Sequence, residues 1–246
     1  MPLCKLTGII LRYADYREVD RILTLFSREK GKIAISARGC RRQNNPISGS
    51  CQLFAYSEIV AFENRGRYTI NTADLCEAFY PIREDIDRFT CASFVTTLCD
   101  FLIGDDEQSE EMFTLLYHTL SVLSYTDIDP LDMAICFAVR ALRISGYMPV
   151  LSYCVKCRTR VTAQKTVRFA PDLGGSVCDS CSSESITVSA LALEAMRRMS
   201  QLADKDIRKV KLPETVRKEL LNLLRAYSMC TFDNISRVFD IIQHEK

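Results

Sequence analysis

The spacing of apolar side chains changes once along the chain, near residue 80, and this change predicts two structurally different parts. Before it, apolar and polar residues alternate in short runs, as in half-buried β-strands. We expect five strands, within residues 6–11, 21–27, 31–38, 53–63 and 67–75. The sequence Asn64-Arg65-Gly66 is a turn between the last two. Five short strands in so few residues favour a small closed barrel of the OB type.

From Pro81 onward apolar residues recur every three to four positions, which is the helical period. Three residues are expected helix N-caps: Ser109, Asp129 and Ser189. Pro130 directly follows the cap Asp129 at the first helical position, and Pro213 is expected to begin another helix. The apolar stripes are expected to form the core: Phe94, Leu98 and Phe101; Phe113, Leu116, Leu120 and Leu123; Leu131, Ile135, Ala138 and Leu142; Ala192, Met196, Met199 and Ala203; Val216, Leu220, Leu223 and Tyr227; Phe232, Ile235, Phe239 and Ile242.

Two matched cysteine pairs interrupt this helical region. Cys154 and Cys157 are followed, after twenty residues, by Cys178 and Cys181. Two such pairs can supply four thiolates in a tetrahedron, the arrangement of a structural zinc site, and no position is left open for water. Gly174-Gly175 allows a sharp turn before the second pair. The alternatives are a redox dithiol, which needs only one pair in a βαβ setting, and ordinary buried cysteines.

These patterns define the expected architecture. The chain is an α+β multidomain protein with a five-stranded OB-like barrel in residues 1–80 and an all-α domain in residues 81–246. The zinc module is inserted at about residues 150–186, and the helices on either side of it must pack together as one bundle.

Composition places the chain in the cytoplasm. Its 246 residues include 48% hydrophobic ones, enough for a real core, and 12 cysteines. The first twenty residues lack the apolar centre of a signal peptide, and no uncharged run reaches membrane-spanning length. The eight cysteines outside the two pairs are therefore expected to be reduced and mostly buried.

The net charge of +1 conceals a strong asymmetry along the chain. Residues 1–80 have 12 basic and 8 acidic side chains, residues 81–149 have 4 and 12, and residues 150–246 have 16 and 11. Two basic thirds flank an acidic middle third, so a polyanion could bind part of the surface and be excluded from the rest. Solvated charge without a partner is the alternative.

A basic loop between the third and fourth strands is the best candidate for a nucleic-acid contact. It contains Arg38, Arg41 and Arg42, and arginine donates paired hydrogen bonds to phosphate. We expect a flexible loop that follows a single strand, extended by further cations if the barrel brings them together: Lys30, Lys32, Arg65 and Arg67. A second basic face is a weaker candidate, and solvated charge is its usual explanation: Arg197, Arg198, Lys205, Arg208, Lys209 and Lys211.

Motifs of catalysis are missing from the sequence. The two histidines, His118 and His244, lie in no recognisable catalytic pattern, and phosphate-binding glycine loops are absent. The acidic run at residues 105–107 is expected to be solvated charge between helices. We therefore expect a binding protein. A zinc-stabilised regulator of one duplex sequence and an adaptor that contacts only proteins are the other classes, although no base-reading recognition helix is evident.

Several segments together resemble the bacterial recombination mediator RecO family. Residues 16–27, Gly31-Lys32 and residues 37–42 resemble its N-terminal barrel. Residues 142–149, 154–157 and 169–181 resemble its helix end and zinc module, in the right order over nearly the whole chain. Two departures stand out: Arg158 follows the first cysteine pair where glycine is common, and Cys40 places an oxidisable thiol inside the basic loop.

The resemblance implies a non-enzymatic protein of DNA repair and recombination. Such proteins bind single- and double-stranded DNA, anneal complementary strands and help load RecA onto coated strands. Their partners are the ring protein RecR and the C-terminal tail of single-strand-binding protein, and their location is the nucleoid. The resemblance carries the basic loop over to Arg38, Arg41 and Arg42, and the metal ligands over to the four paired cysteines. The pocket for the partner tail and the oligomeric state stay unassigned.

Overall fold

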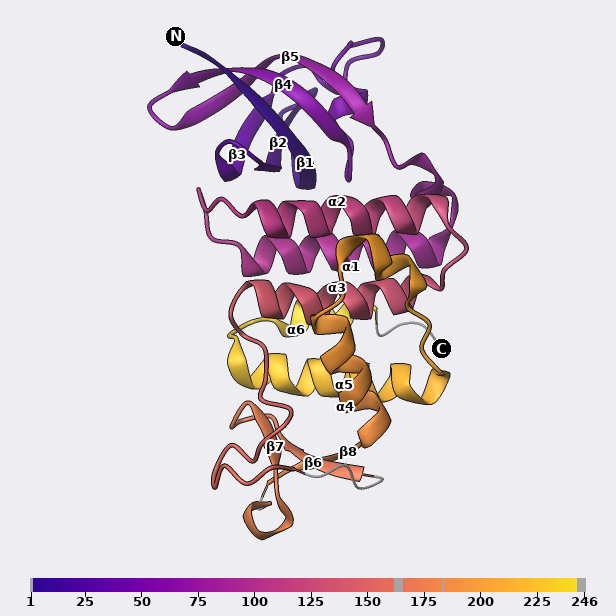
Figure 1. Cartoon of the computed structure of the whole chain (residues 1–246). Coiled ribbons are helices and arrows are strands. Elements are labelled where there is room, and N and C mark those ends of the chain that lie inside the picture. Colours follow the sequence, from indigo (N-terminus) through magenta and orange to yellow (C-terminus); the bar gives the residue numbers. More distant parts are fainter. Residues whose placement is uncertain (1, 162–165, 183, 243–246) are drawn as a thin grey trace. The chain divides into compact units, whose positions relative to one another are not determined.

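The computed structural model describes residues 2–161, 166–182 and 184–242 (Figure 1). The chain divides into two compact units, Met1–Tyr125 and Thr126–Lys246. The first unit combines the barrel with two helices that sequence analysis assigns to the helical domain. The predicted domain boundary at residues 80 and 81 remains a prediction.

Five strands form the barrel of the first unit, as the alternating pattern predicts. They are β1 (Leu3–Tyr16), β2 (Asp20–Ser27), β3 (Gly31–Ala37), β4 (Tyr56–Asn64) and β5 (Arg67–Glu77). Their order is β1-β2-β3-β5-β4, and β4 pairs with β1 to close the barrel. All neighbours are antiparallel except β3 and β5, which are parallel. The expected OB-like barrel followed by a helical region is confirmed.

Alternate side chains of each strand point into the barrel and form its core. Leu23 and Leu25 of β2 and Ile35 of β3 are fully buried, and their neighbours along each strand face outward. The segment between β3 and β4 adds Cys40, Ile47 and Cys51 to this core. At about 25 cal/mol per Å² of apolar surface, such burial is the main favourable contribution to the stability of the barrel.

Helices α1 (Ile86–Leu102) and α2 (Glu110–Tyr125) lie side by side against one side of the barrel (Figure 1). The carboxylate of Asp85 caps α1 by accepting from the N–H groups of residues 87 and 88, and Ser109 Oγ accepts from Met112 N–H at the start of α2. Phe113 of α2 contacts Phe26 of β2, with 5.5 Å between ring centroids. The prediction for Phe101 is wrong, since its side chain is 36% exposed at the end of its stripe.

The acidic connection between α1 and α2 has exposed side chains, as predicted, while its backbone attaches to the barrel. Asp106 N–H donates to Lys32 O at 3.0 Å, and Lys32 Nζ lies 3.5 Å from Asp105. Gly31 adopts a φ of +68°, and a Cβ there would lie 2.2 Å from Glu107 O. Only glycine allows the β2–β3 turn to come this close to the connection.

The second unit is built around α3 (Pro130–Ile144), whose residues from Asp132 to Leu142 are all buried. It packs against α4 (Ala190–Ser200) and α5 (Glu214–Thr231), so helices before and after the cysteine module do share a bundle, and α6 (Ser236–Asp240) packs against α5. The predicted caps at Asp129 and Ser189 are confirmed. Buried Asp132 is paired with Arg217 Nε at 2.8 Å and accepts from Leu212 N–H.

A three-stranded antiparallel sheet carries the cysteine module in this unit. Its strands are β6 (Thr166–Ala170), β7 (Gly175–Val177) and β8 (Ile186–Ser189), in the order β7-β6-β8. Strand β8 runs directly into α4 through Ser189, and Phe169 of β6 contacts Tyr227 of α5. Of the helices that the structure describes, none has the length and apolar character needed to cross a membrane.

Candidate metal centre and nucleic-acid interface

Each cysteine pair sits on a turn that local hydrogen bonds define. In the first, Arg158 N–H donates to Cys154 O at 2.9 Å and Cys154 N–H donates to Thr159 O at 2.8 Å. In the second, Cys178 follows β7 and Cys181 N–H donates back to Cys178 O at 2.9 Å. Val155 N–H donates to Ser176 O, which joins the first turn to β7. The two turns therefore meet.

The four sulfur atoms all lie within 4.8 Å of one another. Cys157 Sγ and Cys178 Sγ are 3.6 Å apart. Zinc–sulfur bonds of about 2.3 Å imply sulfur–sulfur edges of about 3.8 Å in a tetrahedron, so the spacing fits a metal of this size. All four side chains are free thiols with no disulfide among them. The four predicted ligands thus form one group that could hold a metal.

The electrostatics of this group also favour a cation. Backbone N–H groups of residues 157 and 178 point at the Cys154 sulfur and lower its pKa to about 6. Hydrogen bonding with neighbouring sulfurs, together with the negative charge of Cys154, raises the pKa of Cys178 and raises that of Cys181 to about 12. Four thiolates this close together would repel one another, and a positive ion between them would favour the deprotonated form.

Two special backbone positions shape the module. Gly174 has a φ of +71° in the β6–β7 turn, as the turn prediction requires, and a Cβ on Gly175 would lie 2.6 Å from Val150 O. Arg158 has a φ of +65°. This left-handed conformation explains why glycine is favoured after such a pair, and arginine adopts it at a cost.

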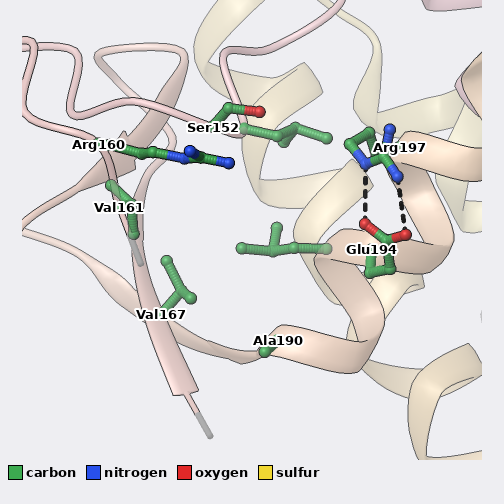
Figure 2. Close-up of a pocket in the computed structure, with 9 residues that line it drawn as sticks. Ser152, Arg160, Val161, Val167, Ala190, Glu194 and Arg197 are labelled. Carbon is green, nitrogen blue, oxygen red and sulfur yellow. Dashed lines mark hydrogen bonds and ion pairs between the residues drawn. The ribbon is translucent and has the colours of Figure 1, made fainter. Parts of the chain in front are cut away.

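A pocket of about 600 Å³ lies between the cysteine module and α4 (Figure 2). Its floor is apolar and includes Val161, Val167 and Leu193. Arg160 points into it from the module, and on α4 Glu194 holds Arg197 through two hydrogen bonds of 2.8 Å (Figure 2). The carboxylate of Glu194 is held by Arg197 and Arg198, and the lining gives no indication of a particular ligand.

The basic loop, residues 38–55, is firmly attached to the barrel, so the prediction of a flexible loop is wrong. Gly39 N–H donates to Asp20 Oδ1 at 2.7 Å, and Arg41 N–H donates to Val19 O at 3.0 Å. Asn45 bridges the loop, since its Nδ2 donates to Gly39 O at 2.8 Å and its Oδ1 accepts from Ile47 N–H at 3.0 Å. The side chains of Arg38, Arg41 and Arg42 are left exposed.

Cys40 is not at the surface of this loop. Its side chain is only 3% exposed and faces the barrel core beside Cys51. Burial raises the pKa of the Cys40 thiol and raises that of Cys51 to about 12. The thiol is therefore a core side chain, and the expectation of an oxidisable group next to a DNA contact is wrong.

The other predicted cations of the barrel lie in a different place. Lys30 is 3.6 Å from Glu63, next to the β4–β5 turn that carries exposed Arg65 and Arg67. Lys32 is mostly buried, donates to Asp100 O at 2.7 Å and forms ion pairs with Asp100 and Asp105. The structure thus groups Lys30 with Arg65 and Arg67, and it uses the Lys32 ammonium to attach the barrel to α1.

The second basic face is partly neutralised by its own carboxylates. Glu194 binds both Arg197 and Arg198, and these two guanidinium groups lower the pKa of Glu194 to about 2. Asp206 pairs with Lys209 at 2.6 Å. Of the two histidines, for which the sequence predicts no catalytic role, His118 lies half-buried beside Tyr117, and His244 lies outside the described residues.

Sequence analysis missed the outer face of β1, β2, β3 and β5. Strand register places Ala14 beside Ile22, Ile22 beside Ser36, and Ser36 beside Thr69 in one row across it. Tyr16 and Ile22, 48% and 39% exposed, lie on this face next to the basic loop. Combining the alternation of β1 with the turn after Tyr16 could have revealed it.

Fold and site together define a class: a protein with an exposed basic OB barrel and a four-cysteine module in a helical region. A family model described as "Recombination protein O N terminal" matches residues 1–79, and one described as "Recombination protein O C terminal" matches residues 83–231. The chain therefore belongs to the RecO family of DNA repair and recombination proteins.

Curated relatives agree over most of the chain. "DNA repair protein RecO" of Symbiobacterium thermophilum is 33% identical over 231 residues, 92% of this chain and 91% of the relative. Its namesake in Acetivibrio thermocellus is 35% identical over 181 residues, 74% and 71% of the two chains. That of Alkaliphilus metalliredigens is 29% identical over 237 residues, 95% and 96% of the two chains.

Proposed function

We propose that this chain is a recombination mediator that binds single- and double-stranded DNA, anneals complementary strands and helps load RecA onto strands coated by single-strand-binding protein. It acts by binding and not by catalysis. The observation that supports this proposal is the ordered loop that presents Arg38, Arg41 and Arg42 to solvent on an OB barrel. OB barrels with cationic surfaces bind the backbone of single strands without reading their sequence.

The proposed DNA surface has two cationic ends. The basic loop is one, and Lys30 with Arg65 and Arg67 is the other. Lys32 is left out because its side chain is mostly buried and paired with two carboxylates, whereas Arg41 and Lys30 each have one carboxylate partner and an exposed side chain. Neutralising phosphates releases bound counterions, and two strands whose charges are reduced can pair while they are held.

The cysteine group holds one structural zinc ion in this proposal. Four thiolate ligands leave no coordination position for a water molecule, so the metal stabilises the module and performs no chemistry. The spacing of the sulfur atoms and the need for a cation among them support this assignment.

A strand-annealing assay in the presence of single-strand-binding protein tests the function directly. We expect the purified chain to accelerate pairing of complementary oligonucleotides coated with that protein, and to do so for unrelated sequences alike. If the oligonucleotides annealed no faster with this protein than without it, whether or not the coating protein is present, the proposal would be contradicted.

The partners are the RecR ring and the C-terminal tail of single-strand-binding protein, in the cytoplasm at the nucleoid. Support comes from membership of the family and from the resemblance of the sequence segments. We expect co-elution with RecR, and binding to intact single-strand-binding protein that is lost when its tail is removed. Equal binding to the tail-less protein would contradict the tail as the contact.

A further inference from the structure

An exposed tyrosine and an exposed isoleucine lie together on the outer face of the barrel. Strand β1 pairs Tyr16 with Asp20 and Ala14 with Ile22, so Tyr16 and Ile22 are diagonal neighbours on one face of the β1–β2 ladder. Their exposed fractions are 48% and 39%. Phe26 and Lys32 lie on the same face and contact α2 and α1, so the helices cover one end of this face and leave Tyr16 and Ile22 exposed at the other.

The surroundings of this pair select the chemistry of the ligand. The guanidinium of Arg17 lies over the Tyr16 ring at 5.2 Å. Arg38 follows directly on β3, in the register position beside Asp20, and Arg67 precedes Tyr68, whose partner on β3 is Ile35. Between these cations the face has small side chains, which include Ala14, Ala34 and Ser36. Asp20, opposite Tyr16, already accepts a hydrogen bond from Gly39 N–H, and a patch of small and apolar side chains with cations at its edges matches a chain of planar bases joined by phosphates.

The other exposed tyrosine of β1 offers a contrast within the same strand. Tyr13 is 41% exposed, but it pairs with fully buried Leu23 and so belongs to the opposite face of the strand. Arg21 covers its ring at 3.9 Å and is itself bound to Asp15 at 2.9 Å. Tyr13 thus belongs to an intramolecular cluster with Arg21 and Asp15. Tyr16, in contrast, has the more distant Arg17 over one face of its ring, on the outer face of the strand.

We propose that Tyr16, with Ile22 beside it, is a stacking platform for the bases of an unpaired DNA strand. The inference rests on the proposed DNA-binding function and adds a specificity determinant to it. Phosphate contacts treat single strands and duplexes alike, because both present a backbone. A stacking contact requires a base that is out of its pair, so Tyr16 makes the barrel prefer unpaired strands.

The test compares three probes: an oligothymidylate, an abasic oligonucleotide of the same length and a duplex. Stacking is worth roughly 1–3 kcal/mol per base, so we expect Tyr16→Ala to weaken oligothymidylate binding roughly 5- to 150-fold. Binding of the abasic strand and of the duplex should stay near that of the unaltered protein. The salt dependence should also be unchanged, because no cation is lost.

Three control variants make the test decisive. Tyr16→Phe keeps the ring and should bind oligothymidylate like the unaltered protein. Tyr13→Ala should still bind oligothymidylate more tightly than the abasic strand. Ile22→Ala should lose less affinity for oligothymidylate than Tyr16→Ala. Equal losses on normal and abasic strands, or no loss for Tyr16→Ala, would overturn the platform. Absence of binding by the unaltered protein to every probe would instead overturn the proposed function, so the two failures are distinguishable.

Discussion

The basic loop and the cysteine module are both irregular stretches of chain that present functional side chains, but they are held in shape differently. The loop is fastened by its own peptide groups and by Asn45, with Cys40 and Cys51 buried beneath it. The module has a small apolar core, made chiefly of Ala170, Val177 and the cysteines themselves. The chain alone stabilises the loop, whereas we propose that the module also relies on a metal ion.

In the basic loop, the side chains proposed to bind DNA differ from those that order the backbone. In the cysteine module, the same side chains serve both purposes. Removal of the exposed arginines leaves the hydrogen bonds of the loop backbone and of Asn45 in place and breaks the surface ion pair between Arg41 and Asp15. The cysteines of the module are part of its core and are also its proposed ligands, so their removal would disturb packing and metal binding together. The four predictions below test this contrast.

Loss of the second cysteine pair should have the largest effect. We expect Cys178→Ser with Cys181→Ser to abolish metal binding and unfold the module, since apparent zinc-binding energies in small zinc domains are about 10–16 kcal/mol. Zinc content by atomic absorption and proteolysis of residues 150–186 measure this. Cys230→Ser, an exposed cysteine of α5, is the control and should keep about one zinc per chain. A double variant with full zinc content and no added cleavage would contradict the metal site.

Replacing Arg38, Arg41 and Arg42 together with alanine should come next. Single-strand affinity should fall, and the slope of log K against log salt should flatten by up to about 2, because each phosphate contact contributes about 0.7. Thermal stability should change little, since all three side chains are exposed and the ion pair between Arg41 and Asp15 lies at the surface. Replacement by three lysines, which keeps the charge, should retain most of the slope. An unchanged affinity and slope in the alanine variant would remove the loop from the interface.

Asn45→Ala tests whether the chain alone orders the loop. The two hydrogen bonds of the side chain should be worth about 1–3 kcal/mol of unfolding free energy. Urea denaturation measures this loss, and amide exchange should become faster in residues 38–48. The slope of log K against log salt for DNA binding should be unchanged, because no cation is removed. Exposed Gln43 provides the matched control, and equal stability of the two alanine variants would contradict the account.

Arg158→Gly should have the smallest effect, and in the stabilising direction. Glycine adopts the left-handed backbone without the cost of about 1 kcal/mol that arginine bears there, although its freedom in the unfolded chain offsets part of the gain. We expect slightly tighter zinc binding in a competition assay with a chelator. Weaker binding would show that the arginine side chain itself supports the turn. Arg160→Gly is the control and should bring no gain.

Local patterns in the sequence predicted the elements and the metal group well. Alternation over residues 31–38 and the stripe of α5 each depend on neighbours a few positions away, and Asp129 and Ser189 cap their helices through bonds within the same turn. The spacing within each cysteine pair likewise determines how its two sulfur atoms lie around one point. These features need no knowledge of distant segments.

Features that depend on distant segments could not be predicted. The role of Lys32 depends on Asp100, which lies 68 positions away in the sequence. Because the Lys32 ammonium binds Asp100, it is not presented to solvent. Cys40 looks like a loop residue until the loop folds back over the barrel and buries it. Tyr16 is exposed only because α1 and α2 cover a different part of the barrel, a consequence of packing that no short pattern records.

The central claim is that the cationic barrel binds nucleic acid by its backbone, and one titration tests it most directly. Affinity for random single-stranded oligonucleotides should be measured over a series of salt concentrations. We predict binding that is indifferent to sequence and a straight line of log K against log salt, with a slope of up to about −4 if Arg38, Arg41, Arg42, Lys30, Arg65 and Arg67 all take part. Absence of binding in dilute buffer, or binding that salt does not weaken, would contradict the claim.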